Sequence, residues 1–131
     1  MSTTNILITP AADCPAPGAE IPPMKAKPTR ATIEYDLLTT QPYTLTHMDF
    51  SHAVHVAMAK VAGKPAQSFE DFHAKGQPCM RASALTKRYG WAAHYDGEGR
   101  LALVDPQSAA FGALSADPDL PRAQAMRSKR A

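Results

Sequence analysis

Two short runs of alternating residues that flank a tight turn constrain the fold of this chain more than any other feature. The runs are Trp91–Tyr95 and Arg100–Val104, and Asp96-Gly-Glu-Gly99 lies between them. An Asp-Gly pair between two alternating runs is a strong signal for a β-hairpin, because the turn needs residues that tolerate a positive φ. The sequence therefore predicts an antiparallel hairpin over residues 91–104.

A further strand and several helices are expected around this hairpin. Residues 5–9 form a β-branched, apolar run that Pro10 ends, which predicts a strand. Six prolines in residues 10–28 exclude a helix or a central strand there and predict a long loop. Apolar periodicity, caps and breakers predict helices at residues 29–41, 49–62, 68–76, 83–89 and 105–114.

Two of these helices carry specific boundary signals. Thr46 and Asp49 resemble a capping box at the start of the second helix, and Gly63 is expected to end it as a left-handed cap. The last helix should begin with Asp105 as its N-cap and Pro106 as its first helical residue.

Together these elements predict an α+β fold in one small domain. A short antiparallel sheet, made of the N-terminal strand and the 91–104 hairpin, would pack on one face against about four helices. The length of 131 residues leaves little room for a second core. We expect residues 1–121 to form this domain, with the proline-rich loop at 10–28, and residues 122–131 to form a basic C-terminal tail.

The distribution of charge bears on the partners of the protein. The formal net charge is +2, but four of the fourteen basic residues and none of the twelve acidic ones fall in residues 122–131. Residues 1–121 therefore carry a net charge of −2, which disfavours a domain that binds nucleic acid through a basic face. Nucleic acid is thus a less favoured partner, because a basic tail is most often a solvated end.

The sequence also bears on the compartment. No segment approaches the ~20 continuous apolar residues that cross a bilayer, and the N-terminus lacks the basic start and apolar stretch of a secretory signal. We therefore expect no membrane partner and a cytoplasmic protein, in which Cys14 and Cys79 are reduced thiols. The sequence leaves the oligomeric state open.

The stretch from residue 75 to residue 94 combines cations, neutral polar groups and aromatic rings, and it is the leading candidate for a binding site. The candidate ligand-binding residues are Lys75, Gln77, Arg81, Ser83, Lys87, Arg88, Tyr89 and Trp91. Cations beside hydroxyl and amide groups suit a phosphate or carboxylate, and a neighbouring ring suits a base or a sugar. We therefore expect a small anionic or phosphorylated ligand. In the alternative interpretation, the rings belong to the hairpin core and the charges coat a helix.

Two functions from other classes stay open. An enzyme would use Cys79 as a nucleophile with His94 as its base, because nearby positive charge raises the thiolate fraction. An inert, buried cysteine is the alternative at this position. An interaction module would use the basic tail, or residues 83–104 as a winged-helix-like unit that binds duplex DNA. We assign no catalytic residue, and the sequence leaves open whether the chain is an enzyme.

Metal and cofactor signatures are weak. Asp49-x-x-His52-x-x-His55 and Glu70-x-x-His73 share an acid-x-x-His spacing that carboxylate-bridged metal sites use. Such sites need two more carboxylates, for which the sequence offers no obvious pair, and a polar helix face explains these histidines equally well. The chain also lacks the P-loop, dinucleotide-glycine, CxxC, HExxH and nucleophile-elbow patterns. We expect no metal and no cofactor.

A set of short motifs spread over the chain forms one specific combination. The motifs are Asp13-Cys-Pro15, Glu20-Ile-Pro-Pro23, Lys75-Gly-Gln-Pro-Cys-Met-Arg-Ala-Ser83, Leu85, Lys87-Arg-Tyr-Gly-Trp91, His94-Tyr-Asp96 and Ala125-Met-Arg-Ser-Lys-Arg130. This combination resembles a family of small, mainly microbial proteins of unknown function. It departs from the family pattern at Ala84 and Ala92, where a proline and a glycine are common. The resemblance implies no activity, substrate or cofactor, but it places the basic–aromatic stretch and the tail in one family-wide pattern.

Overall fold

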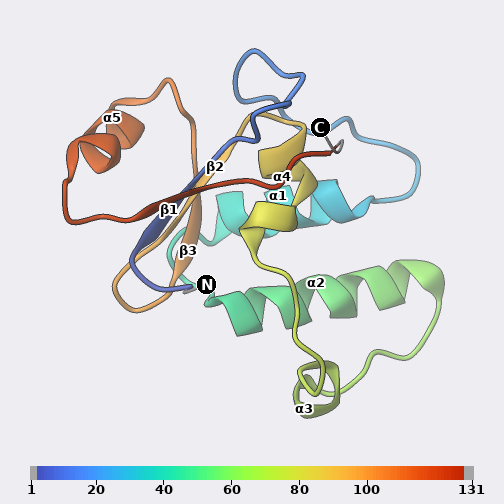
Figure 1. Ribbon diagram of the computed structural model, residues 1–131. Coiled ribbons are helices and arrows are strands. Elements are labelled where there is room, and N and C mark those ends of the chain that lie inside the picture. Colours follow the sequence, from blue (N-terminus) through green and yellow to red (C-terminus); the bar gives the residue numbers. More distant parts are fainter. Residues whose placement is uncertain (1–2, 129–131) are drawn as a thin grey trace.

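The computed structural model describes residues 3–128 and has an α+β fold, which confirms the predicted class (Figure 1). Its elements are β1 (Ile6–Thr9), α1 (Arg30–Thr40), α2 (His47–Ala62), α3 (Phe69–Phe72), the 3-10 turn η1 (Met80–Ala82), α4 (Ala84–Lys87), β2 (Ala92–Tyr95), β3 (Leu101–Val104), α5 (Ala109–Ala116) and β4 (Arg122–Gln124). The N-terminal strand, the hairpin and the helices lie within a few residues of the positions that the sequence predicts.

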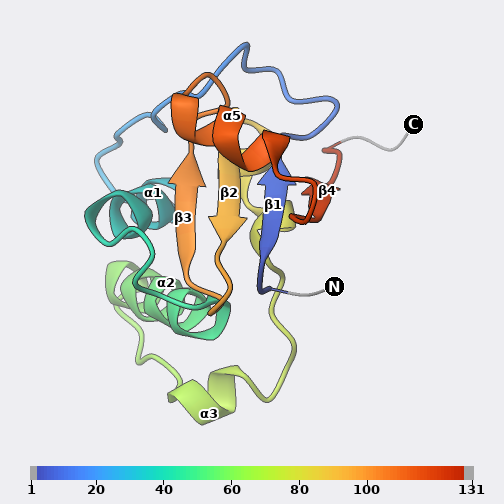
Figure 2. The same ribbon diagram turned by 90° about the vertical axis from the view of Figure 1, so that its left-hand side faces the viewer.

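The strands form one mixed sheet in the order β3-β2-β1-β4 (Figure 2). β2 pairs antiparallel with both β3 and β1, so that His94 has Ala102 on one side and Leu7 on the other. The hairpin turn is closed by a hydrogen bond from Asp96 N to the carbonyl oxygen of Arg100. These pairings confirm the predicted antiparallel sheet of the N-terminal strand and the hairpin.

The fourth strand corrects the expectation of a tail that begins at residue 122. β4 pairs in parallel with β1, with Ile8 opposite Ala123. The chain then continues along the body of the protein, because Met126 N donates to the carbonyl oxygen of Arg81 at 2.8 Å. The three residues of β4 show little strand pattern of their own, and the open edge of β1 recruits them through backbone hydrogen bonds. Residues 129–131 of the predicted tail lie outside the described residues.

Helices cover both faces of the sheet, which corrects the expectation that they pack on one face only. The larger core lies beneath α1, α2 and α4 and includes Ile8, Leu85 and Tyr95. The smaller core contains Leu7 and Ala92 and lies on the opposite face, beneath α5 (Figures 1 and 2). Successive residues of a strand point to opposite faces, so the continuous apolar run of β1 needs a cover on both.

Both predicted caps of α2 are found, but at Thr46 a hydrogen bond between the two side chains takes the place of the backbone bond that would complete a capping box. The Thr46 hydroxyl accepts a hydrogen bond from Asp49 N at 3.3 Å and donates one to the Asp49 carboxylate at 3.0 Å. Gly63 ends the helix with a φ of 67°. Neither α2 nor any other helix between residues 3 and 128 is long and apolar enough to cross a membrane.

The start of α5 differs from the prediction. Ser108, rather than Asp105, is the N-cap, and its hydroxyl accepts from Phe111 N at 3.2 Å. The Asp105 carboxylate accepts from Gln107 N at 2.8 Å and so closes a turn before the helix. Aspartate favours such a local turn as strongly as a helix cap, and the serine three residues later takes the capping role.

The proline-rich loop is held against the residues that lead into the hairpin. Gly90 has a φ of 75°, and a Cβ at this position would lie 2.2 Å from the carbonyl oxygen of Gly18. Glu20 N donates to the carbonyl oxygen of Tyr89 at 2.8 Å, and Trp91 Nε1 donates to that of Glu20 at 2.8 Å. Gly90 therefore permits the close approach of two backbones that these bonds hold together.

This contact predicts a large effect of the variant Gly90→Ala. Gly63→Ala is a matched control, since Gly63 also has a positive φ but a Cβ there would meet nothing within 4 Å. We expect the control to lose about 1–2 kcal/mol of unfolding free energy from backbone strain alone. Gly90→Ala should lose about 3 kcal/mol or more, because the loop must also move away. Urea unfolding measures both losses, and equal losses would show that the contact with Gly18 does not stabilise the fold.

Candidate functional site

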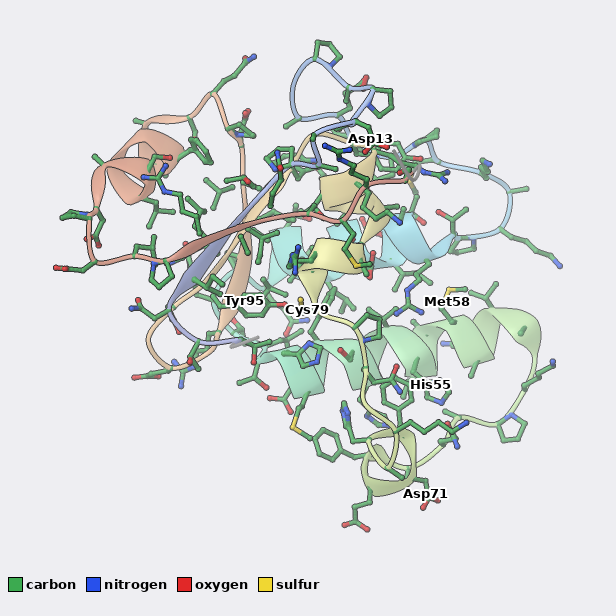
Figure 3. The ribbon with its side chains drawn as sticks, viewed as in Figure 1. Asp13, His55, Met58, Asp71, Cys79 and Tyr95 are labelled. Atoms are coloured by element: carbon green, nitrogen blue, oxygen red, sulfur yellow. The ribbon has the colours of Figure 1, made fainter. Side chains whose placement is uncertain are left out.

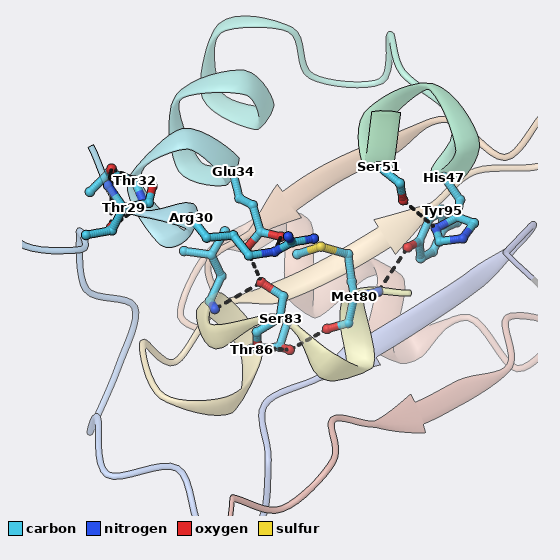
Figure 4. Close-up of polar contacts among 11 residues, drawn as sticks. Thr29, Arg30, Thr32, Glu34, His47, Ser51, Met80, Ser83, Thr86 and Tyr95 are labelled. Carbon is cyan, nitrogen blue, oxygen red and sulfur yellow. Dashed lines mark hydrogen bonds and ion pairs between the residues drawn. The ribbon is translucent and has the colours of Figure 1, made fainter. Parts of the chain in front are cut away.

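The main candidate site is a pocket of about 210 Å³ between α1, α2 and the segment 77–83, which we call the α1–α2 pocket (Figure 4). Its polar lining consists of Arg30 and Glu34 on α1, His47 and Ser51 on α2, Gln77, Cys79 and Ser83 in the segment, and Tyr95 on β2. Phe50 and Met80 add apolar walls. A concave, partly apolar surface with a few converging polar groups is the usual form of a small-molecule site.

Glu34 is the buried carboxyl of this pocket, with 4% of the residue exposed. Its Oε1 accepts a hydrogen bond from Ser83 Oγ at 2.9 Å, and its Oε2 lies 3.6 Å from Arg30 Nε. Burial raises the pKa of Glu34, and the Ser83 hydrogen bond and the charge of Arg30 offset this only in part. The carboxyl group therefore holds a proton more readily than a solvent-exposed glutamate does.

Arg30 lies at the rim of the pocket, because its side chain is 55% exposed whereas that of Glu34 is 6% exposed. Its Nε lies 3.6 Å from Oε2 of Glu34, and within residues 3–128 no hydrogen bond involves its two terminal Nη atoms. Arg30 is also the first residue of α1, a helix without an acidic residue in its first turn. A guanidinium edge at the positive end of a helix suits an anion.

His47 and Tyr95, two further titratable groups of the pocket, favour their neutral forms. Burial lowers the pKa of His47, and a hydrogen bond with the Gln77 backbone offsets this only in part. The Tyr95 hydroxyl oxygen accepts from Met80 N at 3.2 Å, and burial raises the pKa of Tyr95 well above its ordinary value. At neutral pH, the imidazole and the phenol therefore offer hydrogen bonds rather than charge.

Three of the predicted site residues lie in this pocket. Ser83 is buried and binds Glu34, and Cys79 is half-buried in the lining, near Tyr95 (Figure 3). Gln77 also lines the pocket, and its Nε2 donates to the carbonyl oxygen of Phe72 at 3.1 Å.

The predicted basic residues do not line the pocket. Arg81 Nε donates to the carbonyl oxygen of Gln124 at 2.7 Å and so holds β4 in place. Arg88 is exposed and lines a separate hollow beside the C-terminal segment. Lys75 is exposed and Lys87 is half-buried. The guanidinium group of the α1–α2 pocket is that of Arg30 instead.

The predicted aromatic residues pack within the protein. The ring of Trp91 contacts that of Tyr35, with 5.7 Å between their centroids, and its indole N–H is bound to the backbone of Glu20. Tyr89 packs against the larger core. These contacts agree with the alternative interpretation, in which the rings belong to the core.

The pleat of β2 separates Cys79 from His94. Cys79 lines the same pocket as Tyr95, and His94 is the strand neighbour of Tyr95, so its side chain points to the opposite face of the sheet. There, the Tyr43 hydroxyl lies 2.9 Å from His94 Nδ1, and burial lowers the pKa of His94. This geometry does not support a Cys79–His94 nucleophilic pair.

The histidines of the acid-x-x-His motifs join α2 to α3 and the loop before it. His52 Nε2 lies 3.0 Å from the carbonyl oxygen of Gln67, whose backbone N–H donates to His55 Nε2 at 2.9 Å. His73 Nε2 lies 2.8 Å from the carbonyl oxygen of Met48. Within residues 3–128, no group of three or more His, Cys, Asp or Glu side chains is placed to share a metal ion.

The segment 83–104 does not have the form of a winged helix. Its helix, α4, has four residues, of which Leu85 and Thr86 are buried. A recognition helix must present its side chains to the major groove over several turns, which a single buried turn cannot do.

The sequence-based prediction misses five of the eight polar pocket residues: Arg30, Glu34, His47, Ser51 and Tyr95. The spacing of the first four nevertheless carries a signal. Glu34 lies four residues before the buried Leu38, so it shares the apolar face of α1, and Arg30 lies four residues before Glu34. His47 and Ser51 have the same spacing on α2. A charged residue inside an apolar stripe is the pattern that would have identified this site.

Comparison with family models gives one match, over residues 1–131, to a model described as "Family of unknown function (DUF6157)". The chain belongs to this family. The match confirms the predicted membership of a family of unknown function. Comparison with curated proteins and with solved structures found no significant match. A functional proposal for this family member therefore rests on the chemistry of its pocket.

The burial of Glu34 predicts how stability depends on pH. Its pKa is raised on folding, so the folded state binds the proton more tightly, and stability falls as pH rises from the unfolded pKa through the folded one. The variant Glu34→Gln lacks this proton but keeps an acceptor for Ser83. We expect the stability of the variant relative to the wild type to increase as pH rises from the ordinary pKa of a glutamate through the raised pKa of Glu34. Urea unfolding of both proteins tests this, and a constant difference would contradict it.

Proposed function

We propose that this protein binds a small molecule that carries a carboxylate or phosphate group in the α1–α2 pocket. The observation that carries the proposal is the position of Arg30 beside the buried Glu34–Ser83 pair, where its terminal Nη atoms form no hydrogen bond within residues 3–128. Two parallel N–H donors of a guanidinium match the two oxygens of a carboxylate or phosphate. Arginine is the standard choice wherever such bidentate recognition is needed.

The rest of the pocket suits the neutral part of such a molecule. Ser51 and Gln77 provide a hydroxyl and an amide, and His47 provides an imidazole whose pKa is lowered by burial. Phe50 and Met80 provide apolar contact. The volume of about 210 Å³ limits the ligand to a small metabolite rather than a dinucleotide or a polymer.

The proposal keeps the ligand class that the sequence favours and changes the residues that hold it. Gln77 and Ser83 keep their expected polar role, while Arg30 replaces Arg81, Lys87 and Arg88 as the cation. The interaction-module alternative has less support, because Arg122–Gln124 form an edge strand and Ser128 N donates to the Asp13 carboxylate at 3.0 Å.

Substitutions of Arg30 test the proposal directly. A panel of inorganic phosphate, succinate and glycerol 3-phosphate is titrated into the protein by calorimetry at constant ionic strength. We expect at least one probe to bind, and Arg30→Gln to weaken its binding by about tenfold to a hundredfold, the usual worth of charged hydrogen bonds. Arg30→Lys should recover only part of the loss, because an ammonium group lacks the planar fork.

Arg100→Gln is the matched control for this experiment. Arg100 has a similarly exposed side chain, at 51%, and also forms one ion pair, with Glu98, but it lies outside the pocket lining. We expect this variant to bind the probes as the wild type does. Equal loss in Arg30→Gln and Arg100→Gln would indicate a general charge effect, and no binding of any probe at millimolar concentration would contradict the proposal.

The two cysteines allow a second test in the unaltered protein. Cys79 lines the pocket and Cys14 does not, although both are half-buried. At a probe concentration ten times its Kd, we expect the alkylation of Cys79 by iodoacetamide to slow by about tenfold. Alkylation of Cys14 should keep its rate. Mass spectrometry of the labelled peptides measures both rates, and unchanged labelling of Cys79 by a bound probe would locate the ligand elsewhere.

A further inference from the structure

The hydrogen bonds around Glu34 determine which of its oxygen atoms can carry a proton. Ser83 Oγ accepts the N–H of Leu85 at 3.1 Å as the N-cap of α4. A hydroxyl has a single hydrogen, and the Ser83 hydroxyl donates it to Glu34 Oε1 at 2.9 Å. Oε1 is therefore an acceptor in this structure. A proton bound to Glu34 would lie on Oε2, the oxygen atom nearer to Arg30.

The ion pair between Arg30 and Glu34 is a long one. The distance of 3.6 Å from Nε to Oε2 exceeds the range of a direct hydrogen bond, so the guanidinium acts on the carboxylate mainly through its charge. Among residues 3–128, Arg30 is the one side chain with a fixed positive charge in the lining of the pocket. The ionised state of Glu34 therefore depends on a cation that also faces the ligand.

An anion bound to the outer edge of Arg30 makes the ionised form of Glu34 less favourable. It brings a negative charge close to the Glu34 carboxylate and offsets the positive charge that favours its ionised form. It also excludes water from the pocket, which strengthens the repulsion between the two negative groups. Both effects drive a proton from the solvent onto Oε2.

We propose that anion binding in the α1–α2 pocket is coupled to proton uptake by Glu34, so that the pocket takes up an anion and a proton together. This inference rests on the proposed function of the pocket. The proton comes from the solvent, no other bond forms or breaks, and affinity for the anion rises as pH falls. By linkage, Glu34 also selects against anions when the pH is high enough to keep it ionised.

Three other titratable groups face the same pocket and must be separated from Glu34. These groups are His47 on α2, Cys79 before η1 and Tyr95 on β2. A phenol is neutral when protonated and burial raises the pKa of Tyr95, so Tyr95 has no proton to gain from an anion at neutral pH. His47 is the competing source of proton uptake, because an imidazole becomes cationic on protonation and would then attract the anion.

Sulfate is a suitable probe, because its charge stays constant across the pH range of the experiment. It is titrated calorimetrically into the wild-type chain at about pH 6.5 in buffers of different ionisation enthalpy. The slope of the observed enthalpy against the buffer enthalpy counts the protons taken up. We expect a positive slope of a fraction of a proton, and an affinity that falls by up to about tenfold per pH unit as pH rises through the raised pKa of Glu34.

Two variants identify the side chain that takes up the proton. Glu34→Gln keeps the size of the side chain and an acceptor for Ser83, and it should bind sulfate with no proton uptake from that site and a flatter pH profile. His47→Gln should retain the uptake of the wild type. The proton uptake of the wild type is measured without any variant, so this part of the test remains valid even if Glu34→Gln is less stable.

The outcomes separate this inference from the proposed function. Sulfate binding with zero slope in the wild type, or with the same slope in Glu34→Gln, would overturn the proton coupling and leave the anion pocket in place. Uptake that is lost in His47→Gln and kept in Glu34→Gln would move the proton to His47 and overturn the assignment. Absence of binding by sulfate and by every probe of the panel would overturn both proposals.

Discussion

The position of β1 between β2 and β4 is the constraint on which the rest of the structure depends. Ile6, Leu7 and Ile8 are at most 6% exposed, and their side chains alternate between the two cores. Burial of each such side chain contributes roughly 1.5–3 kcal/mol, so this strand alone contributes an amount comparable to the net stability of a small domain. Its pairing with β2 also sets the register of the hairpin, and thereby places Tyr95 beneath the α1–α2 pocket.

Those parts of the fold that arise from local chemistry could be predicted from the sequence. The hairpin turn, the Thr46 cap and the Gly63 cap each act within a few residues, and all three are found in the structure, although the positive φ of the turn is at Gly99 and not in the Asp-Gly pair. The prediction is wrong where the position of a segment depends on residues that are distant in the sequence. β4 exists because β1 has an open edge, and α5 lies on the second face because Leu7 and its neighbours in the sheet need a cover there. No local pattern in either segment encodes these partners.

The candidate site also depends on residues that are distant in the sequence. Residues 75–91 pass through an extended segment, a 3-10 turn, a single α-turn and the residues that lead into β2, so neighbouring side chains leave in different directions. Arg81 therefore binds the backbone of Gln124 while Trp91 binds that of Glu20. The pocket instead gathers residues from four segments, which are α1, α2, residues 77–83 and the end of β2 at Tyr95, and only residues 77–83 belong to the predicted stretch. Clustering in sequence implies clustering in space only along one regular element.

Glu34 is the pocket residue whose presence is explained better by a function than by the stability of the fold. An apolar residue at this position would extend the buried face of α1, and replacing a buried ion pair by packed apolar groups is often neutral or stabilising by about 1–4 kcal/mol. The loose pairing with a half-exposed Arg30 does not offset the desolvation of a carboxylate, as the raised pKa of Glu34 indicates. A group that costs stability and faces a pocket is more readily explained by binding than by folding. The incomplete neutralisation that makes Glu34 unfavourable for the fold is also what would allow an anion on Arg30 to change its protonation.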